Sequence, residues 1–256
     1  MRNIFDRSGG RTPIMFLLAA ILAVPGLACH DALEVELPGR IPTDLLNDPT
    51  TAPTLAASVT ADFECAFANY VVVTSMIGDD FLGASGNLNA KNWGTKKIYE
   101  DDTANEQNTC NDNQGFGAYT PLQTARFQSD DVLKRLSEWT DDQAKTSLAP
   151  LRAKVAVLGG FTYTLLGEGF CAMRLDKETS IKTPAEVLAI AKSKFDAALA
   201  LVNDMADGAA KTELLNLLYV GRARTLLDLG DKAGAAADAA LVAPGFEFDV
   251  TRSVDA

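Results

Sequence analysis

The sequence predicts an all-α fold, and three observations support that prediction. Apolar side chains recur at helical spacing over most of the chain after residue 53, and helix start signals precede several of these stripes. No segment alternates persuasively between apolar and polar residues, apart from a short possibility at 97–99. Because side chains three or four positions apart share one face of a helix, whereas a strand has a period of two, we expect a helical domain over 53–256.

The first 28 residues are interpreted as a signal peptide. Arg2, Arg7 and Arg11 precede an unbroken apolar run at 14–24, which Pro25 and Gly26 end. A basic lead and an apolar run shorter than the roughly 18–20 residues of a spanning helix are typical of such a segment. The small residue before Cys29 indicates a lipoprotein, in which the Cys29 thiol carries the lipid. Ordinary secretion with a plain thiol is the alternative, and both interpretations place the chain outside the cytoplasm.

The charge of the chain argues against two classes of partner. The whole sequence carries −11, and residues 1–28 contain three arginines and one aspartate, which leaves −13 on the rest. An acidic protein does not bind nucleic acid readily, nor does it adsorb to anionic lipid surfaces. Attachment to a membrane would therefore have to come from the lipid on Cys29.

Three cysteines remain after Cys29, which favours one disulfide and one buried thiol in an oxidising compartment. Cys65 lies on an apolar helical stripe, so we expect it to be the buried thiol. Cys110 lies in a polar loop that a disulfide would stabilise, and we expect it to pair with Cys171. The cysteine spacings match no zinc pattern and the single histidine, His30, adjoins the lipid site, so we expect no metal and no cofactor.

The N-terminal half of the mature chain divides into a tether, a helix and a loop. Prolines interrupt residues 29–52, which we expect to be an irregular tether. An apolar stripe from Leu55 to Ile77 predicts the first long helix. Glycine, asparagine, aspartate and threonine dominate 83–119, which predicts a long irregular loop. Loops of this length in compact domains are usually functional or disordered.

The C-terminal half contains further helices with recognisable starts. We expect one helix from Pro121 to about Trp139, and a capping box of Thr140 with Gln143 before the next. We expect that box to begin the next helix, whose apolar stripe runs from Leu148 to Leu165, with a start at Pro150 as the alternative. The sequence Thr-Pro-Ala-Glu at 183–186 is a second capping box, with proline at the first helical position.

The last two helices are predicted at 214–229 and 233–242, with Gly230-Asp231 between them. Small side chains at Ala223 and Ala235 would let the two helix backbones approach closely where they cross. This arrangement favours helical hairpins of the tetratricopeptide type. A plain helical bundle remains the alternative, since alanine-rich helices also pair in bundles.

The loop at 83–119 contains the candidate ligand-binding residues. Sugar rings stack on exposed aromatic faces, while their hydroxyl groups need amide partners. The loop offers both kinds of side chain, in Asn89, Asn92, Trp93, Tyr99 and Tyr119. Trp93 is the strongest candidate for binding a ligand, although its side chain could equally be buried against the helices and anchor the loop there.

Catalysis is not expected. The paired carboxylates of the sequence are explained by helix ends, loop solvation or pairs with basic residues one turn away. Glu168, between two glycines at the end of an apolar helix, is expected to hydrogen-bond loop backbone. No motif of the nucleophile type is present, so we expect a binding protein rather than an enzyme.

Taken in order, these segments resemble the SusD/RagB family of nutrient-uptake lipoproteins. The resemblance rests on the lipobox-like cysteine with its proline-rich lead and on five helical segments: FECAFANYVVVTSMIGDDF, YTPLQTARFQSDDVLKRLSEW, LRAKVAVLGGFTYTLLGEGF, TPAEVLAIAKSKFDAAL and LLYVGRARTLLDLGDKAGAAADAALV. Members of this family are usually longer, and their irregular C-terminal half holds much of the ligand site. We therefore expect that half to be absent here, since this sequence stops at Ala256.

The resemblance implies a lipoprotein of the outer membrane that faces the cell exterior. Such a protein caps a SusC-like TonB-dependent transporter and captures oligosaccharides or other nutrients. The alternative is a tetratricopeptide-like envelope scaffold that mediates protein–protein assembly. The loop at 83–119 favours nutrient capture, because a pure scaffold has little use for a long excursion rich in asparagine, glycine and aromatic residues.

Overall fold

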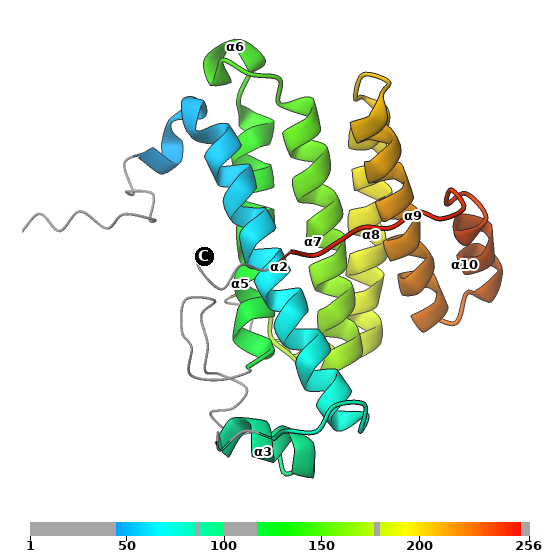
Figure 1. The fold of residues 1–256 in the computed structure, drawn as a ribbon. Helices are drawn as coiled ribbons and strands as arrows, with labels where there is room; N and C mark the ends of the chain where they lie inside the picture. Colours follow the sequence, from blue (N-terminus) through cyan, green and yellow to red (C-terminus); the bar gives the residue numbers. More distant parts are fainter. Residues whose placement is uncertain (1–44, 85, 87, 100–116, 177–179, 252–256) are drawn as a thin grey trace, which may run out of the picture. The chain divides into compact units, whose positions relative to one another are not determined.

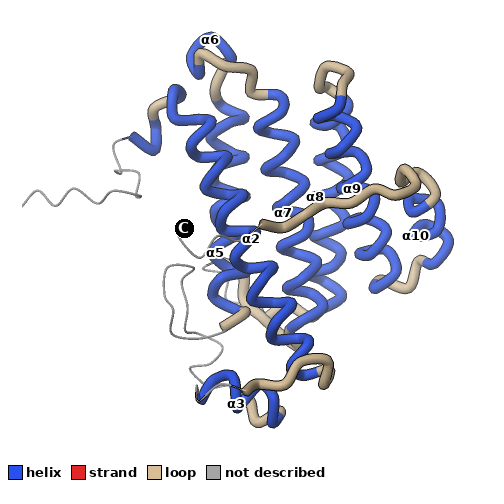
Figure 2. The backbone as a smooth tube through the Cα atoms, in the orientation of Figure 1, coloured by secondary structure: helices blue, strands red, loops and turns tan. Residues whose placement is uncertain are grey.

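A computed structural model describes residues 45–84, 86, 88–99, 117–176 and 180–251. The chain divides into two units, 1–42 and 43–256, and the first lies outside the described residues, as do the signal peptide, Cys29 and most of the predicted tether. The regular elements of the described residues are all helices, which confirms the all-α prediction (Figures 1 and 2). They are η1 (Leu45–Asn47), η2 (Pro49–Thr51), α2 (Ala52–Ile77), α3 (Leu88–Thr95), α5 (Tyr119–Glu138), α6 (Asp141–Ala144), α7 (Ala149–Gly169), α8 (Pro184–Asn203), α9 (Ala209–Asp228) and α10 (Lys232–Ala239).

Both predicted capping boxes form, at the starts of α6 and α8, but the box of Thr140 and Gln143 begins only the four-residue helix α6, and the long helix α7 begins separately at Ala149. At α8, the Thr183 backbone N–H donates to the Glu186 carboxylate at 2.7 Å, and the Thr183 hydroxyl accepts from the Glu186 N–H at 3.4 Å. Such reciprocal bonds satisfy N–H groups that the first helical turn leaves unpaired. A third cap appears at α10, where the Asp231 carboxylate accepts from the Gly234 N–H at 2.9 Å. Local chemistry therefore sets where these helices begin.

Helix α7 lies at the centre of the bundle and packs against α2, α5, α8 and α9. Its residues 155–167 are buried without interruption. A helix that is apolar all round can be stable only when neighbours cover every face, and α7 meets that requirement. The threonines in this stretch satisfy their hydroxyls internally: Thr164 Oγ1 lies 2.7 Å from Thr225 Oγ1 of α9.

The packing of α7, α8 and α9 is closest around the Phe195 ring of α8. A Cβ added at Gly160 would lie 2.7 Å from the Phe195 ring, and one added at Gly221 would lie 2.6 Å from the Phe161 ring and also contact Phe195. The two rings meet edge to face, with centroids 5.3 Å apart. The two glycines therefore leave the space that the Phe161 and Phe195 rings occupy.

Two predictions about local structure are wrong. The segment predicted as an irregular loop contains helix α3, while 100–116 lies outside the described residues. The end of the predicted tether forms two short 3-10 turns, and α2 begins at Ala52, three residues before the predicted stripe. In both cases tertiary contacts outweigh weak local propensity: Trp93 packs α3 onto α2, and the Arg135 guanidinium of α5 donates to the Leu46 carbonyl at 3.0 Å.

We expect Gly221→Ala to lower the free energy of unfolding by about 1–3 kcal/mol, because the methyl group overpacks the space beside Phe161 and Phe195. Helix propensity alone would favour alanine by about 1 kcal/mol. Urea denaturation followed by circular dichroism measures the difference. Gly94→Ala in α3 is the matched control, because its nearest neighbouring atom would lie 4.0 Å away. Equal stability of the two variants would contradict the close packing at Gly221.

Candidate functional site

A cavity of about 790 Å³ lies where α2 and α7 end and α5 begins. Five of its lining side chains are aromatic: Tyr70, Trp93, Tyr99, Tyr119 and Phe170. They come from four separate parts of the chain, so the helix order of the bundle brings them together. Tyr119 and Phe170 meet edge to face, with ring centroids 5.0 Å apart. The volume falls within the range of typical small-molecule sites.

Three of the five predicted ligand-binding residues line this cavity: Trp93, Tyr99 and Tyr119. Asn92 is half-buried in α3 and does not line it. Asn89 lies in α3, but its side chain falls outside the described residues. Asn92 therefore supplies no amide group to this cavity, and its role in binding a ligand stays a prediction.

Trp93 is not the exposed stacking platform that the sequence suggested. Only 4% of its surface is exposed, and it packs with Val73 and Met76 of α2 and with Ala118. The alternative interpretation, that Trp93 fastens its segment to the helices, describes this packing. Its indole Nε1 is buried and has no hydrogen-bond partner, the one such side-chain atom among the described residues. Buried donors are usually paired, so this N–H is an unusual feature of the cavity wall.

Tyr70 and Phe170 are aromatic residues of the cavity that sequence reasoning missed. Tyr70 belongs to the apolar stripe of α2, and Phe170 follows the last residue of α7, so both looked like core. The glycine before Phe170 was the available signal. A Cβ at Gly169 would lie 2.9 Å from the Tyr70 ring, so this position lets the end of α7 approach α2.

A charged cluster adjoins the cavity behind Tyr70. Arg224 of α9 holds both carboxylate oxygens of Glu168, with Nε at 2.5 Å and Nη2 at 2.6 Å. The Tyr70 hydroxyl donates to the same carboxylate at 3.1 Å. The expectation that Glu168 bonds loop backbone is therefore corrected, because its described partners are side chains on α2 and α9.

Two pKa values in this cluster are displaced. Burial, followed by the negative charge of Glu168, raises the pKa of Tyr70 above its usual range. Burial and a hydrogen bond with Glu168 raise the pKa of Asp228 to about 6, against the opposing effect of Arg224. The folded state therefore binds a proton on Asp228 more tightly than the unfolded chain does.

We expect Asp228→Asn to raise the melting temperature at pH 7.5 and to leave it nearly unchanged at pH 3.5. The unfolded carboxyl titrates near 3.8 and the folded one near 6, so Asp228 favours folding below pH 4 and loses that contribution as pH rises through 6. Thermal denaturation across this range measures the effect. The matched control is Asp204→Asn, on an exposed turn after α8. A lower melting temperature for Asp228→Asn at pH 7.5 would contradict the sign.

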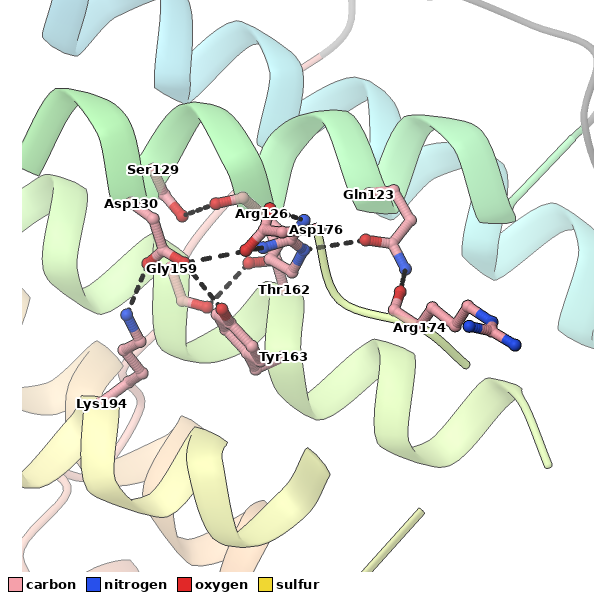
Figure 3. Close-up of polar contacts among 10 residues, drawn as sticks. All are labelled: Gln123, Arg126, Ser129, Asp130, Gly159, Thr162, Tyr163, Arg174, Asp176 and Lys194. Atoms are coloured by element: carbon pink, nitrogen blue, oxygen red, sulfur yellow. Dashed lines mark hydrogen bonds and ion pairs between the residues drawn. The ribbon is translucent and has the colours of Figure 1, made fainter. Parts of the chain in front are cut away.

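A second polar cluster lies between α5, α7 and α8, away from the cavity lining (Figure 3). Asp130 accepts from the Tyr163 hydroxyl at 2.6 Å and from Lys194 Nζ at 2.5 Å. Arg126, whose side chain is 4% exposed, binds both carboxylate oxygens of Asp176 at 2.8 and 3.3 Å. Burial alone would lower the pKa of Arg126, but Asp176 and Tyr163 raise it, and Arg126 in turn lowers the pKa of Asp176.

This second cluster is best explained as a set of contacts that stabilises the fold rather than as a binding site. Each of its charged groups has a partner of opposite charge, which is the arrangement that makes burial of charge tolerable. Gln123 donates to the Arg174 carbonyl at 3.2 Å, and Met173 and Lys182 exchange backbone bonds of 2.8 and 3.1 Å. Together these contacts hold 173–176, which follows directly on the cavity residues at 170–172.

The predicted disulfide between Cys110 and Cys171 is wrong. Cys65 is disulfide-bonded, whereas Cys171 is a free, exposed thiol that lines the cavity. The partner of Cys65 lies outside the described residues. Cys65 is buried as predicted, but it is not the free thiol. The prediction assigned the disulfide from the composition around Cys110, and composition does not show which cysteines the fold brings together.

We expect peptide mapping of the unreduced protein to recover Cys171 as an alkylated free thiol and Cys65 only in a disulfide-linked peptide. The physical reason is exposure: the Cys171 thiol can be reached by iodoacetamide, and the Cys65 sulfur is already bonded. Reduction before alkylation is the control, and it should release Cys65. A disulfide that contains Cys171 would contradict the structure.

Two features are absent from the part of the chain that the structure describes. No group of three or more histidine, cysteine or acidic side chains is arranged to hold a metal ion. None of the described helices combines the length and apolar character needed to cross a bilayer. No family model, characterised protein or solved structure matches this chain.

Proposed function

We propose that this chain is an exported lipoprotein that captures a nutrient in the aromatic cavity and presents it to a SusC-like TonB-dependent transporter. The single observation that carries the proposal is the cavity itself, which gathers Trp93, Tyr99 and Tyr119 with Tyr70 and Phe170. The sequence resemblance to SusD/RagB lipoproteins supplies the transporter as partner and an oligosaccharide as one candidate nutrient. In this proposal the protein binds and does not catalyse.

The proposed place of action is the outer membrane, with the protein facing the cell exterior and anchored through lipid on Cys29. Support comes from the sequence before Cys29, which lies outside the described residues. The acidic character of the chain is consistent with attachment by lipid rather than by charge. The consecutive helix pairs α7–α8 and α9–α10 pack against each other, which supports a tetratricopeptide-like arrangement as part of the same proposal.

We expect a tagged full-length chain, isolated from the outer membranes of the cells that produce it, to bring a large TonB-dependent barrel with it. The physical reason is that, in this proposal, the captured nutrient crosses the outer membrane through the transporter, so the two proteins must form a complex. Mass spectrometry of the isolated complex identifies the barrel. The Cys29→Ser variant is the control, and it should leave the membrane fraction because it cannot be acylated.

Recovery with an inner-membrane or periplasmic complex instead would overturn the proposal. That outcome would favour the envelope scaffold, in which the helices bind another protein and the cavity has no nutrient. A Cys29→Ser chain that stays in the outer-membrane fraction would overturn the lipid anchor separately.

A further inference from the structure

We infer that the cavity takes an uncharged, largely apolar ring compound with few hydroxyl groups, rather than an oligosaccharide or a charged nutrient. This inference rests on the proposed function, since it assumes that the cavity captures a ligand. It concerns only the chemical class of that ligand. Three properties of the cavity wall carry it: its charge, the state of its hydroxyl groups, and the shape of its aromatic surface.

The wall of the cavity contains no charged side chain among the described residues that line it. The Glu168 carboxylate, which adjoins the cavity behind Tyr70, is already held by Arg224 and by the hydroxyl of Tyr70. A charged ligand would lose its water without gaining an opposite charge. The described part of the wall therefore favours a neutral occupant.

Two hydroxyl groups of the described wall donate their hydrogens to the protein itself. The Tyr70 hydroxyl donates to Glu168, and the Thr74 hydroxyl donates to the Tyr70 carbonyl at 2.8 Å. The Tyr119 hydroxyl accepts from Gln123 at 3.1 Å. An oligosaccharide has a hydroxyl on most ring carbons, and each one that enters without a partner disfavours binding. Asparagine, glutamine, aspartate and glutamate, the usual partners of sugar hydroxyls, are absent from the described lining.

The aromatic side chains supply ring surface instead. Tyr119 and Phe170 meet at an interplanar angle of 70°, so they present differently oriented surfaces. At the same site Ile77 and Tyr99 are 40% and 66% exposed, so apolar surface continues to the outside. Ring faces and edges of this kind pack well against another planar, weakly polar ring. A cavity of about 790 Å³ has room for a compound of two or more fused rings.

The free thiol of Cys171 provides a reporter, because it is exposed and lines the cavity. The experiment measures the rate at which iodoacetamide alkylates Cys171 in the full-length chain held in lipid nanodiscs. Three probes are compared: 2-acetylnaphthalene, which is neutral; 2-naphthoate, which has the same ring system and a negative charge; and maltoheptaose. Free glutathione alkylated under the same conditions controls for direct effects of the probes on the reagent.

We expect 2-acetylnaphthalene to slow the alkylation of Cys171 saturably and 2-naphthoate to bind at least about tenfold more weakly. Ala172→Phe, at an exposed lining position, should weaken protection by about tenfold because the added ring occupies the cavity. Ala206→Phe is the matched control on an exposed turn after α8, and it should behave as the unaltered chain. Maltoheptaose should give no protection.

The outcomes separate this inference from the proposed function. Protection by maltoheptaose and not by 2-acetylnaphthalene would overturn the ligand class and leave nutrient capture standing. Equal protection by the neutral and the charged naphthalene would overturn the requirement for a neutral ligand. No protection by any probe, or protection that is the same in Ala172→Phe, would overturn ligand capture by this cavity, whatever barrel is recovered from the outer membrane.

Discussion

The close contact of Phe195 with two glycines is the constraint on which the rest of this structure depends. Phe195 of α8 is completely buried, and its ring fills the space that Gly160 of α7 and Gly221 of α9 leave open. Its neighbour Phe161 also contacts Phe63 of α2, with ring centroids 6.0 Å apart. These contacts between rings and between rings and glycines therefore join α2, α7, α8 and α9. Because they fix the position of α7, they also fix the position of its last turn, where the cavity forms.

The sequence predicted the helices well because each has a local cause. Thr140 and Thr183 begin helices with capping boxes, and the buried stripes have helical spacing. The sequence did not predict α3, because asparagine and glycine are poor helix formers and the helix depends on burial of Trp93 against α2. Nor could spacing reveal Tyr70 and Phe170 as cavity residues. An apolar stripe identifies the buried face of a helix. It does not show where two buried faces leave a cavity between them.

The cysteines also show that the sequence predicts local features better than contacts between distant residues. Burial of Cys65 followed from the stripe of α2, which is a local property. Its disulfide depends on which distant parts of the chain meet, which is a property of the whole fold. Cys171 was assigned to a disulfide by elimination, yet it lies at the exposed end of α7 beside the cavity. Counting cysteines constrains how many bonds can form and does not decide which thiols meet.

The two polar clusters and the cavity belong to one arrangement around the end of α7. Arg126 and Asp176 restrain the chain that follows Phe170. From the other side, the Glu168 carboxylate, held by Arg224, accepts a hydrogen bond from the Tyr70 hydroxyl. The Glu168 carboxylate accepts the Tyr70 hydrogen, so that tyrosine contributes its ring rather than a hydrogen-bond donor to the cavity wall. The charges that stabilise the bundle therefore also make the cavity less polar than its tyrosine content suggests.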